Sequence, residues 1–503
     1  MIELTDEQQK AVYSDCKINV VCSVPGSGKT TLLLARAIRL TQQSPDPILV
    51  VTFSKKAAED IQKRIQHAEV ENLDVKTIHS FCYKIVKDHW DDISAIHGND
   101  QWPKEALVAT NLEELNLIGE LFPGKLASDY LSQFNILRSY NLSPEVFARL
   151  DKNGVIAIKV KKAVVQDWTK YEAERLSRGI LIFDDMVNLA SKLMSFAHVS
   201  ASVTRLYSHL LIDEAQDTSE AQWNVLLPLV INADSTLIIG DQNQSLYAFR
   251  GADGSLLTNV SKMPDAVVFR LTKSFRSEKA IASIANLIVH DKASQIITNK
   301  TKGKVTCKGF EKPEDEVAWV LDNVKSNSVI IARTNNYLEI FEREAINKMM
   351  PYTGKGFYRS NHLKDFSIFL RNNPEADVVT LVQKAFIENS QYTREQKEDF
   401  TLVLKLIIQN GVDYFHKLIT RSDELDCSEG FELITGHSSK GLEWDNVFIV
   451  GAQFGQIPHR LAKDFKEEKN IFYVMTTRAR NNLSISFVGT PSSYIPKEYI
   501  NND

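Results

Sequence analysis

VVCSVPGSGKTT, residues 20–31, is the stretch from which the fold of this chain can be worked out. A short apolar run is followed by a turn at Pro25-Gly26 and by Gly28-Lys29-Thr30, which open a helical pattern. A strand that ends in a glycine-rich turn points backbone N–H groups at one spot beside a helix N-terminus, where an anion is favoured. Lys29 adds a full positive charge, and the Thr30 hydroxyl suits the Mg²⁺ that accompanies a triphosphate. The stretch predicts a phosphate-binding loop, with an ordinary glycine turn as the alternative.

The loop fits the pattern G-x-x-x-x-G-K-[ST] at every position but the first, where Ser23 replaces glycine. We therefore expect the start of the loop to turn slightly differently, while Gly26, Ser27 and Gly28 still face the phosphate.

The composition is that of a folded globular protein. A length of 503 residues predicts about three domains, and 43% hydrophobic with 24% charged residues gives no sign of disorder. The polar N-terminus does not read as a signal peptide, and no apolar run reaches the ~20 residues of a membrane span, so we expect a cytoplasmic protein. Five scattered cysteines favour neither a disulfide framework nor a zinc site. A net charge of −5 leaves nucleic-acid binding undecided, because an acidic total can hide a basic groove.

A second apolar run, residues 210–217 (LLIDEAQD), delivers adjacent carboxylates at the end of a strand. One carboxylate in such a place can hold Mg²⁺ and the other can take a proton from an attacking water. We assign the metal to Asp213 and the proton transfer to Glu214. Two acids after a strand are common, but beside a phosphate-binding loop they favour a nucleoside triphosphatase.

A third apolar run, residues 236–240 (TLIIG), leads into a segment with an amide, two aromatic residues and an arginine. Gln244 is a candidate sensor of a γ-phosphate. Phe249 and Arg250 are candidates for stacking on and holding a nucleotide base. Packing into a core is the alternative for the aromatic residues.

Two more strand ends carry side chains suited to ligands. Residues 48–53 (ILVVTF) predict a strand buried on both faces that ends at Phe53, and ligands bind open α/β sheets at such ends. Residues 75–82 (VKTIHSFC) predict a strand that runs into a polar turn, where Thr77 and His79 suit phosphate oxygens. An ordinary loop histidine is the alternative.

Residues 84–179 predict long helices with few strands, and we interpret them as an insertion between two strands of the first sheet. The lysines at 159, 161 and 162 are more typical of a solvated face than of a binding site.

A second α/β unit follows. Its strand-like runs are residues 329–333, 433–439 and 447–450. A helix predicted over residues 467–481 ends in Arg478 and Arg480. Arginines in a second domain suit the charge of a phosphoryl-transfer transition state, although an ion pair is the alternative for each.

Taken in order, these stretches resemble the motifs of superfamily 1 helicases of the UvrD/Rep/PcrA type, over nearly the full length. LTDEQQKAV resembles the Q motif, VPGSGKT motif I, TFSKKAAEDI motif Ia, TIHSFC motif Ib and LLIDEAQDTSEAQ motif II. GDQNQSLYAFRGA resembles motif III, LTKSFRS motif IV, TGHSSKGLEWDNVF motif V and EEKNIFYVMTTRAR motif VI.

The resemblance implies an α/β fold with two RecA-like domains, parallel sheets and an ATP cleft between them. In family terms, domain 1A would comprise residues 1–88 and 179–270, helical domain 1B residues 89–178, domain 2A residues 271–374 and 431–503, and domain 2B residues 375–430. Domain 2B is normally much larger, so here it would be a small helical remnant.

The resemblance also implies roles at the ATP site. Gln8 would read adenine, Phe275 would stack on it and Glu443 would contact the ribose. Arg276 and Arg478 would be arginine fingers, beside the roles already given to Lys29, Thr30, Asp213, Glu214 and Gln244. On the DNA side, the residues that would line a single-stranded track are Phe53, Thr77, His79, Phe249, Arg250, Thr435 and His437. Phe249 stands where many relatives carry tryptophan.

The leading hypothesis is an ATP-dependent 3′→5′ DNA translocase and helicase that uses ATP and Mg²⁺ on single-stranded DNA and single/double-strand junctions. The polarity comes from the resemblance alone. The reduced 2B motivates a second hypothesis, a protein-stripping translocase or motor subunit of a repair, recombination, phage or defence complex with a protein partner. The third is a nucleotide-gated binding module without motor activity, which Glu214 and Arg478 disfavour.

Overall fold

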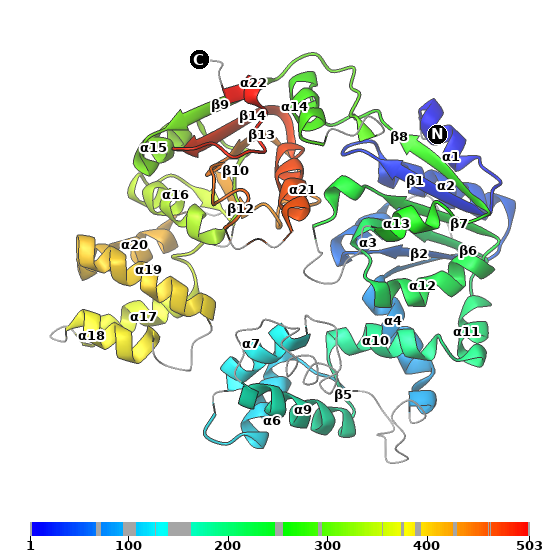
Figure 1. Cartoon of the computed structure of the whole chain (residues 1–503), viewed down its shortest axis with the longest axis horizontal. Coiled ribbons are helices and arrows are strands. Elements are labelled where there is room, and N and C mark those ends of the chain that lie inside the picture. The colour runs from blue at the N-terminus through cyan, green and yellow to red at the C-terminus, as the bar shows by residue number, and fades with distance from the viewer. Residues whose placement is uncertain are drawn as a thin grey trace. The chain divides into compact units, whose positions relative to one another are not determined.

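The computed structural model describes residues 3–66, 72–93, 107–125, 127–138, 162–246, 255–289, 294–354, 356–373, 377–387, 394–425, 430–460, 462 and 464–500. By its contacts the chain forms two units. The first comprises residues 1–23 and 28–271, and the second residues 24–27 and 272–503. Each unit is built on one six-stranded parallel sheet (Figure 1).

The sheet of the first unit has the strand order β3-β2-β6-β7-β1-β8. Its strands are β1 (Ile18–Ser23), β2 (Ile48–Thr52), β3 (Leu73–Thr77), β6 (His209–Ile212), β7 (Ser235–Gly240) and β8 (Ala266–Leu271). β1 lies between β7 and β8 and pairs in parallel with both. Because all strands are parallel, their carboxyl ends meet at one edge, where the ends of β1, β6 and β7 deliver the segments that follow them.

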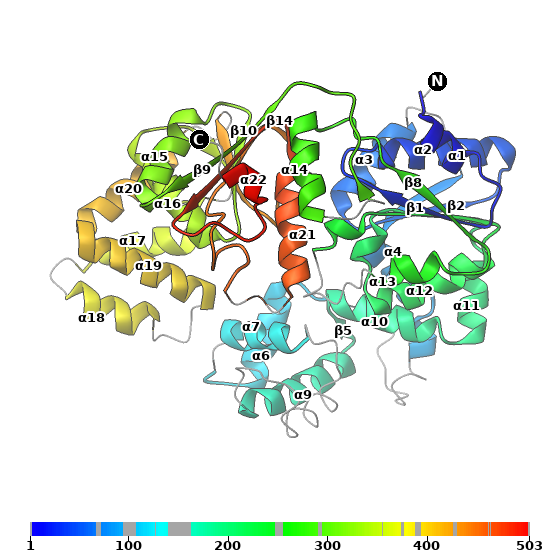
Figure 2. The ribbon, with the colours of Figure 1, turned by 45° about the horizontal axis from the view of Figure 1, so that its top comes forward.

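Helices cover both faces of this sheet, which explains why its central strands β2, β6 and β7 are largely apolar. Successive side chains point to opposite faces, so Val20 packs into one core and Val21 into the other. Helices α1 (Asp6–Val12), α2 (Lys29–Gln43) and α3 (Lys55–Gln66) lie on one face, and α4 (Ile78–Asp88), α10 (Phe183–Leu193) and α12 (Glu220–Asn232) on the other (Figure 2). α11 (Ala197–Thr204) and α13 (Ser255–Val260) complete the second layer.

A helical insertion interrupts the first unit between β3 and β6. It contains α6 (Asn111–Leu121), α7 (Ala127–Arg138) and α9 (Lys162–Ser177), with a short parallel pair β4 (Leu107–Val108) and β5 (Ile180–Leu181). The three helices enclose a core of their own around Phe134, Trp168 and Tyr171. Arg175 on α9 is 1% exposed and forms ion pairs with Glu172 and with Asp185 of α10, which fastens the insertion to α10.

The sheet of the second unit has the order β11-β12-β10-β13-β14-β9. Its strands are β9 (Lys304–Phe310), β10 (Ser328–Ala332), β11 (Tyr352–Thr353), β12 (Phe431–Thr435), β13 (Trp444–Ile449) and β14 (Ala479–Val488). α14 (Lys279–Val289) and α21 (Phe465–Thr476) lie side by side (Figures 1 and 2). α15 (Pro313–Asn323) and α16 (Asn335–Asn347) pack together against the core of the sheet, and α22 (Lys497–Ile500) ends the described chain.

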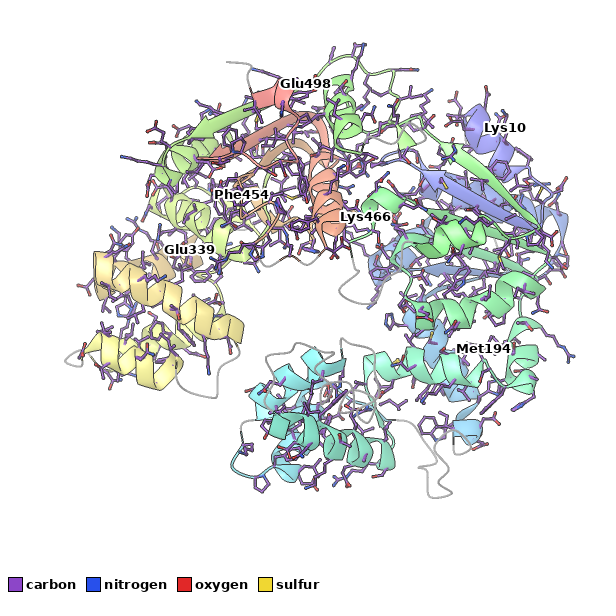
Figure 3. All side chains as sticks on the ribbon, in the orientation of Figure 1. Lys10, Met194, Glu339, Phe454, Lys466 and Glu498 are labelled. Carbon is purple, nitrogen blue, oxygen red and sulfur yellow. The ribbon has the colours of Figure 1, made fainter. Side chains whose placement is uncertain are left out.

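A second, smaller insertion separates β11 from β12. It contains α17 (Asn361–Arg371), α18 (Val378–Val382), a π-helical turn (Gln383–Ile387), α19 (Arg394–Asn410) and α20 (Val412–Glu424). Its aromatic residues Phe366, Phe400 and Phe415 belong to the same apolar cluster as Phe341 of α16 and Leu433 of β12. The cluster is therefore continuous from the sheet into the insertion. Figure 3 labels Glu339 on α16, the helix against which α20 packs.

The structure confirms the α/β fold with two RecA-like parallel sheets. Two local predictions are wrong. The polar turn predicted after the strand within residues 75–82 is the start of a helix, because β3 ends at Thr77 and α4 begins at Ile78, so His79 lies in a helix. The helix predicted over residues 467–481 ends at Thr476, so Arg478 lies in a turn and Arg480 in β14. The boundaries of the four family domains remain a prediction. Within the described residues no helix is long and apolar enough to cross a membrane.

Candidate nucleotide and nucleic-acid sites

The predicted phosphate-binding loop joins the end of β1 to the start of α2. Gly26 and Gly28 have φ angles of 72° and 78°, a left-handed conformation that glycine adopts without strain. Gly28 is the N-cap of α2, and as a glycine it has no side chain with which to cap the helix. Its first N–H groups and the positive end of its dipole are thus at the loop, as an anion site requires.

Ser23 explains why the first glycine of the pattern is dispensable here. It is the last residue of β1, and its hydroxyl donates to the carbonyl of Gly240 at the end of β7 at 3.1 Å. The residue does not need a left-handed backbone, so serine fits the extended conformation and ties two strand ends together.

Gln8 lies against the same loop. It is 2% exposed, and its Oε1 accepts the backbone N–H of Thr5 at 3.0 Å in the capping box of α1. Its Nε2 lies 3.5 Å from the carbonyl of Gly28, and a Cβ at Gly28 would come within 2.7 Å of it. Glycine is therefore required for the approach of Gln8 as well as for the turn.

Asp213 and Glu214 follow β6 directly, as predicted, and Glu214 forms an ion pair with Lys29. Glu214 has φ 52°, a left-handed conformation that is uncommon for glutamate and strained. Its Oε2 lies 3.7 Å from Lys29 Nζ. Asp213 is 6% exposed, and its Oδ1 accepts the N–H of Glu214 at 3.0 Å. The first unit thus brings the predicted lysine and the predicted base together.

Gln216 is a residue that the sequence reasoning missed. It is fully buried, donates from Nε2 to Glu214 Oε2 at 2.5 Å, and accepts the N–H of Asp241 on Oε1 at 2.9 Å. The same amide therefore connects the segment after β6 to the segment after β7. Gln244, the candidate sensor, donates to Asp241 Oδ2 at 2.6 Å. The available signal was the glutamine two residues after Glu214 in DEAQD.

Burial and crowding of negative charge perturb the two aspartates. Burial first, then the charge of Glu214, raise the pKa of Asp213 to about 7. Burial also raises the pKa of Asp241, against the opposing charge of Lys29. A divalent cation beside Asp213 would relieve this crowding, and hydroxyl and carboxylate oxygens such as those of Thr30 and Asp213 are ligands that Mg²⁺ prefers. Thr30 is the second residue of α2 and is half-buried.

The middle of the loop, residues 24–27, belongs to the second unit. The N–H of Phe275 donates to the carbonyl of Gly26 at 2.8 Å, and Ser274 Oγ donates to the carbonyl of Pro25 at 2.8 Å. Phe275 is 49% exposed, and Lys273 Nζ lies 5.4 Å from the centre of its ring. A Cβ at Gly26 would come within 2.4 Å of the Cβ of Arg276.

The two candidate arginine fingers are held by other groups. Arg276 donates from Nε to Glu443 and from Nη1 to the carbonyl of Thr477 at 3.2 Å. Arg478 is 1% exposed and donates to the carbonyls of Val474 at 2.9 Å and Leu442 at 3.1 Å. The structure therefore brings Arg276 and Glu443 together, while Arg478 is buried in backbone hydrogen bonds.

The candidate DNA residues include the same short pattern at two strand ends, one in each sheet. Thr77, the last residue of β3, accepts the N–H of Ser80 on Oγ1 at 3.1 Å. Thr435, the last residue of β12, accepts the N–H of Ser438 on Oγ1 at 3.5 Å. Each pattern reads T-x-H-S, with half-buried His79 and His437 at its third position.

Phe53 follows β2 directly and is half-buried. Phe249 and Arg250 lie outside the described residues, as do Lys159 and Lys161, so the assignments made to them remain predictions.

Two family models match this chain. The model described as UvrD/REP helicase N-terminal domain matches residues 4–265, more than half of the chain. The chain belongs to the UvrD/REP helicase family. The model described as UvrD-like helicase C-terminal domain matches residues 376–490.

Curated relatives agree with this membership over most of the chain. The protein is 23% identical to "ATP-dependent DNA helicase PcrA" of Staphylococcus aureus, over 99% of this chain and 86% of the relative. It is 24% identical to "Probable DNA helicase II homolog" of Mycoplasma capricolum, over 98% and 85%. It is also 24% identical to "ATP-dependent DNA helicase UvrD2" of Mycobacterium bovis, over 99% and 81%. The alignment with PcrA spans 633 positions, more than the 503 residues here, so the relative has segments without a counterpart.

Proposed function

We propose that this protein is an ATP-dependent DNA helicase that moves 3′→5′ along single-stranded DNA. The observation that carries the proposal is the contact of Lys29 with Glu214, and of Glu214 with Gln216, at the carboxyl end of the first sheet. This arrangement places a phosphate-binding cation, a candidate base and a group that orients the base within one set of contacts.

Each residue of the set has a role in hydrolysis of ATP. Lys29 and the N–H groups at the start of α2 hold the phosphates. Glu214 orients the attacking water and takes its proton, and Gln244 responds to the γ-phosphate. Because Gln216 hydrogen-bonds the carboxylate of Glu214, the side chain of the base has one direction before the substrate arrives.

Thr30 and Asp213 are the residues that would hold Mg²⁺. When bound, the metal supplies positive charge that neutralises phosphate oxygens as the bond to the leaving group breaks. The carboxylate of Asp213 has to be ionised for this role, and the cation itself favours the ionised form.

The ATP-site roles of Gln8, Phe275, Arg276, Arg478 and Glu443 rest on the family resemblance. Gln8 contacts the phosphate loop, which supports its assignment to the nucleotide. Arg276 has its backbone beside Gly26 of the same loop, which supports its assignment as a finger. Arg478 would have to leave the carbonyls of Val474 and Leu442 before it reached a phosphate.

The matched T-x-H-S segments support a DNA track that is gripped twice. Thr77 and Thr435 present the same hydroxyl geometry at the ends of strands in different sheets, and short hydroxyl and imidazole donors suit phosphate oxygens. If ATP binding and hydrolysis change the two grips alternately, the protein advances along one strand. The substrates are then single-stranded DNA and its junctions with duplex.

Strand displacement on matched duplexes tests the proposal. We expect ATP-dependent unwinding of a duplex with a 3′ single-stranded tail, and much slower unwinding of the same duplex with a 5′ tail. ATP hydrolysis should rise on addition of single-stranded DNA. Equal rates for both tails would contradict the polarity, and hydrolysis that does not respond to DNA would contradict the motor.

A second candidate is a translocase that strips proteins from DNA or acts as the motor subunit of a larger complex, with weak unwinding alone. The insertion between β11 and β12 favours it, because this insertion is small. Its aromatic residues belong to the same apolar cluster as the core of the sheet, so it is built as part of the second unit. Displacement of a protein block from single-stranded DNA, together with poor unwinding by the purified chain, would support it. Robust unwinding by the monomer would count against it.

A further inference from the structure

Glu443 lies between two guanidinium groups, one on each of its carboxylate oxygens. Arg276 Nε donates to Oε2, and Arg480 donates to Oε1 from Nε at 3.0 Å and from Nη2 at 2.5 Å. Burial raises the pKa of Glu443, but the charges of Arg276 and Arg480 outweigh it and hold the pKa below its usual range. The carboxylate is therefore ionised and shared.

The backbone of Arg276 is held by hydrogen bonds, and its guanidinium group bonds to Glu443 and to the carbonyl of Thr477. Its N–H donates to Ser274 Oγ at 3.3 Å, and its carbonyl accepts Lys300 Nζ at 2.9 Å. Its Cβ lies against Gly26 of the phosphate loop. Its guanidinium, however, is retained by Glu443 and by the carbonyl of Thr477. The backbone of Arg276 thus lies at the phosphate loop, while its guanidinium group lies on the carboxylate of Glu443.

We propose that Arg480 is a positioning residue that lowers the cost of releasing Arg276 from Glu443 to the phosphate. The inference rests on the proposed function. When Arg276 leaves, Arg480 still compensates the charge of Glu443, so no partly buried carboxylate is left without a cation. Because the two guanidinium groups share one carboxylate, the presence of each weakens the attraction of Glu443 for the other.

The surroundings of Arg480 make it suited to this task. Its side chain is 44% exposed, and among the described residues it has one other ion-pair contact, a longer one of 3.8 Å from Nη1 to Asp445. Its backbone is fixed, because its carbonyl accepts the N–H of Glu278 at 3.0 Å. Arg480 therefore stays beside Glu443 whichever partner Arg276 has.

Kinetics of Arg480→Ala test the inference. With Arg480 gone, Glu443 holds Arg276 alone and more tightly, so we expect kcat of DNA-stimulated ATP hydrolysis to fall about tenfold, with KM for ATP changed less than about twofold. A fall in kcat with little change in KM is expected because Arg276 would stabilise the transition state more than it stabilises bound ATP. Arg480→Lys keeps a cation beside Oε1 and should recover most of the rate.

A double variant separates positioning from mere support of the fold. In Arg480→Ala/Glu443→Gln the neutral amide cannot hold Arg276 by charge, so kcat should return to the value of Glu443→Gln alone. Asp445→Asn, which leaves the pair of Arg480 and Glu443 intact, is the matched control and should keep the wild-type kcat.

The outcomes are distinguishable. The inference would be overturned if the factors by which the two single substitutions lower kcat multiplied in the double variant. A wild-type kcat in Arg480→Ala would overturn it as well, and the proposed function would stand in both cases. A raised KM with unchanged kcat would overturn it as well. A wild-type protein whose hydrolysis does not respond to DNA would overturn the proposed function, and the inference with it.

Discussion

Gln216 donates its side-chain amide to the Oε2 atom of Glu214 at 2.5 Å, and Glu214 holds a left-handed backbone at that position. A strained backbone and a buried hydrogen bond together fix one direction for the carboxylate. The orientation of the candidate base is therefore set by a residue that lies outside the acidic pair.

We expect Gln216→Ala to lower kcat of ATP hydrolysis at least tenfold, which is ~1.4 kcal/mol in the barrier, with a small change in KM. Gln216→Glu keeps an acceptor for the N–H of Asp241 but repels Glu214, so its kcat should fall too. Gln242→Ala is the matched control, because the exposed amide of Gln242 donates a hydrogen bond to Thr258 and not to Glu214. An unchanged kcat in both Gln216 variants, measured by phosphate release, would remove Gln216 from the site.

Lys29→Ala should abolish ATP hydrolysis and leave binding of single-stranded DNA in the absence of nucleotide within about twofold. The reason is that the lysine supplies the only full charge in the loop sequence VPGSGKTT, whereas the predicted DNA residues lie at other strand ends. Steady-state hydrolysis and fluorescence anisotropy measure the two properties. Lys10→Ala, on the exposed side of α1, is the control. Turnover retained by Lys29→Ala would show that the loop does not hold the phosphates.

Asp213 predicts how stability depends on pH in the metal-free protein. Its pKa is raised to about 7, above the ~4 of an unfolded chain, so between these values the native state binds a proton that the unfolded state has lost. The free energy of unfolding contributed by this group is thus present below pH ~4 and falls as pH rises to about 7.

Asp213→Asn keeps an acceptor for the N–H of Glu214 and removes the titration. We expect a smaller loss of Tm between pH 5 and pH 8 than in the wild type, measured by thermal unfolding without Mg²⁺. Asp60→Asn, at an exposed carboxylate paired with Arg64, should follow the wild type. Identical pH profiles for Asp213→Asn and wild type would refute the buried, protonated Asp213.

Two arginines three residues apart, Arg175 on α9 and Arg178 just after its end, should differ sharply in their contribution to stability. Arg175 is buried between Glu172 and Asp185, so Arg175→Ala removes the cation paired with Asp185, while Glu172 keeps Arg138, and should cost about 3–5 kcal/mol. Arg178 pairs with Glu120 and Glu174 in solvent, so Arg178→Ala should cost a small fraction of that. Urea unfolding measures both, and equal costs would show that the buried network does not fasten the insertion.

Phe249→Ala should weaken binding of single-stranded DNA by about 1–3 kcal/mol if the ring stacks on a base. Tyr13→Ala, an exposed aromatic residue that follows α1, is the control. Anisotropy titrations at one fixed salt concentration measure the affinities. Equal affinity of Phe249→Ala and wild type would assign the ring to the core.

The fold and much of the candidate ATP site were predictable because their signals are local. Apolar runs that end in polar motifs mark parallel strands, and the strand ends at Ser23, Ile212 and Gly240 lie close to where the sequence predicts them. The start of α4 was missed, although Ile78, Phe81 and Ile85 recur at helical spacing.

Other features depend on contacts between distant segments and were not predictable. The helix over residues 467–481 was extended too far because nothing in the pattern separates the end of α21 from β14, which pairs with β13 and β9. The partners of Glu443 and the burial of Arg478 depend on that pairing. Gln216 acquires its role only when β6 and β7 lie side by side.

The core that α17, α19 and α20 share with the second sheet has a consequence for folding. A segment whose apolar side chains complete the core of its host is expected to gain and lose its structure together with that host, as one cooperative unit. Excision of residues 361–424 would strip the cover from Phe341 and Leu433 and leave an apolar face exposed to water. This insertion is thus an integral layer of the second unit, and it cannot be exchanged between relatives as an independent module.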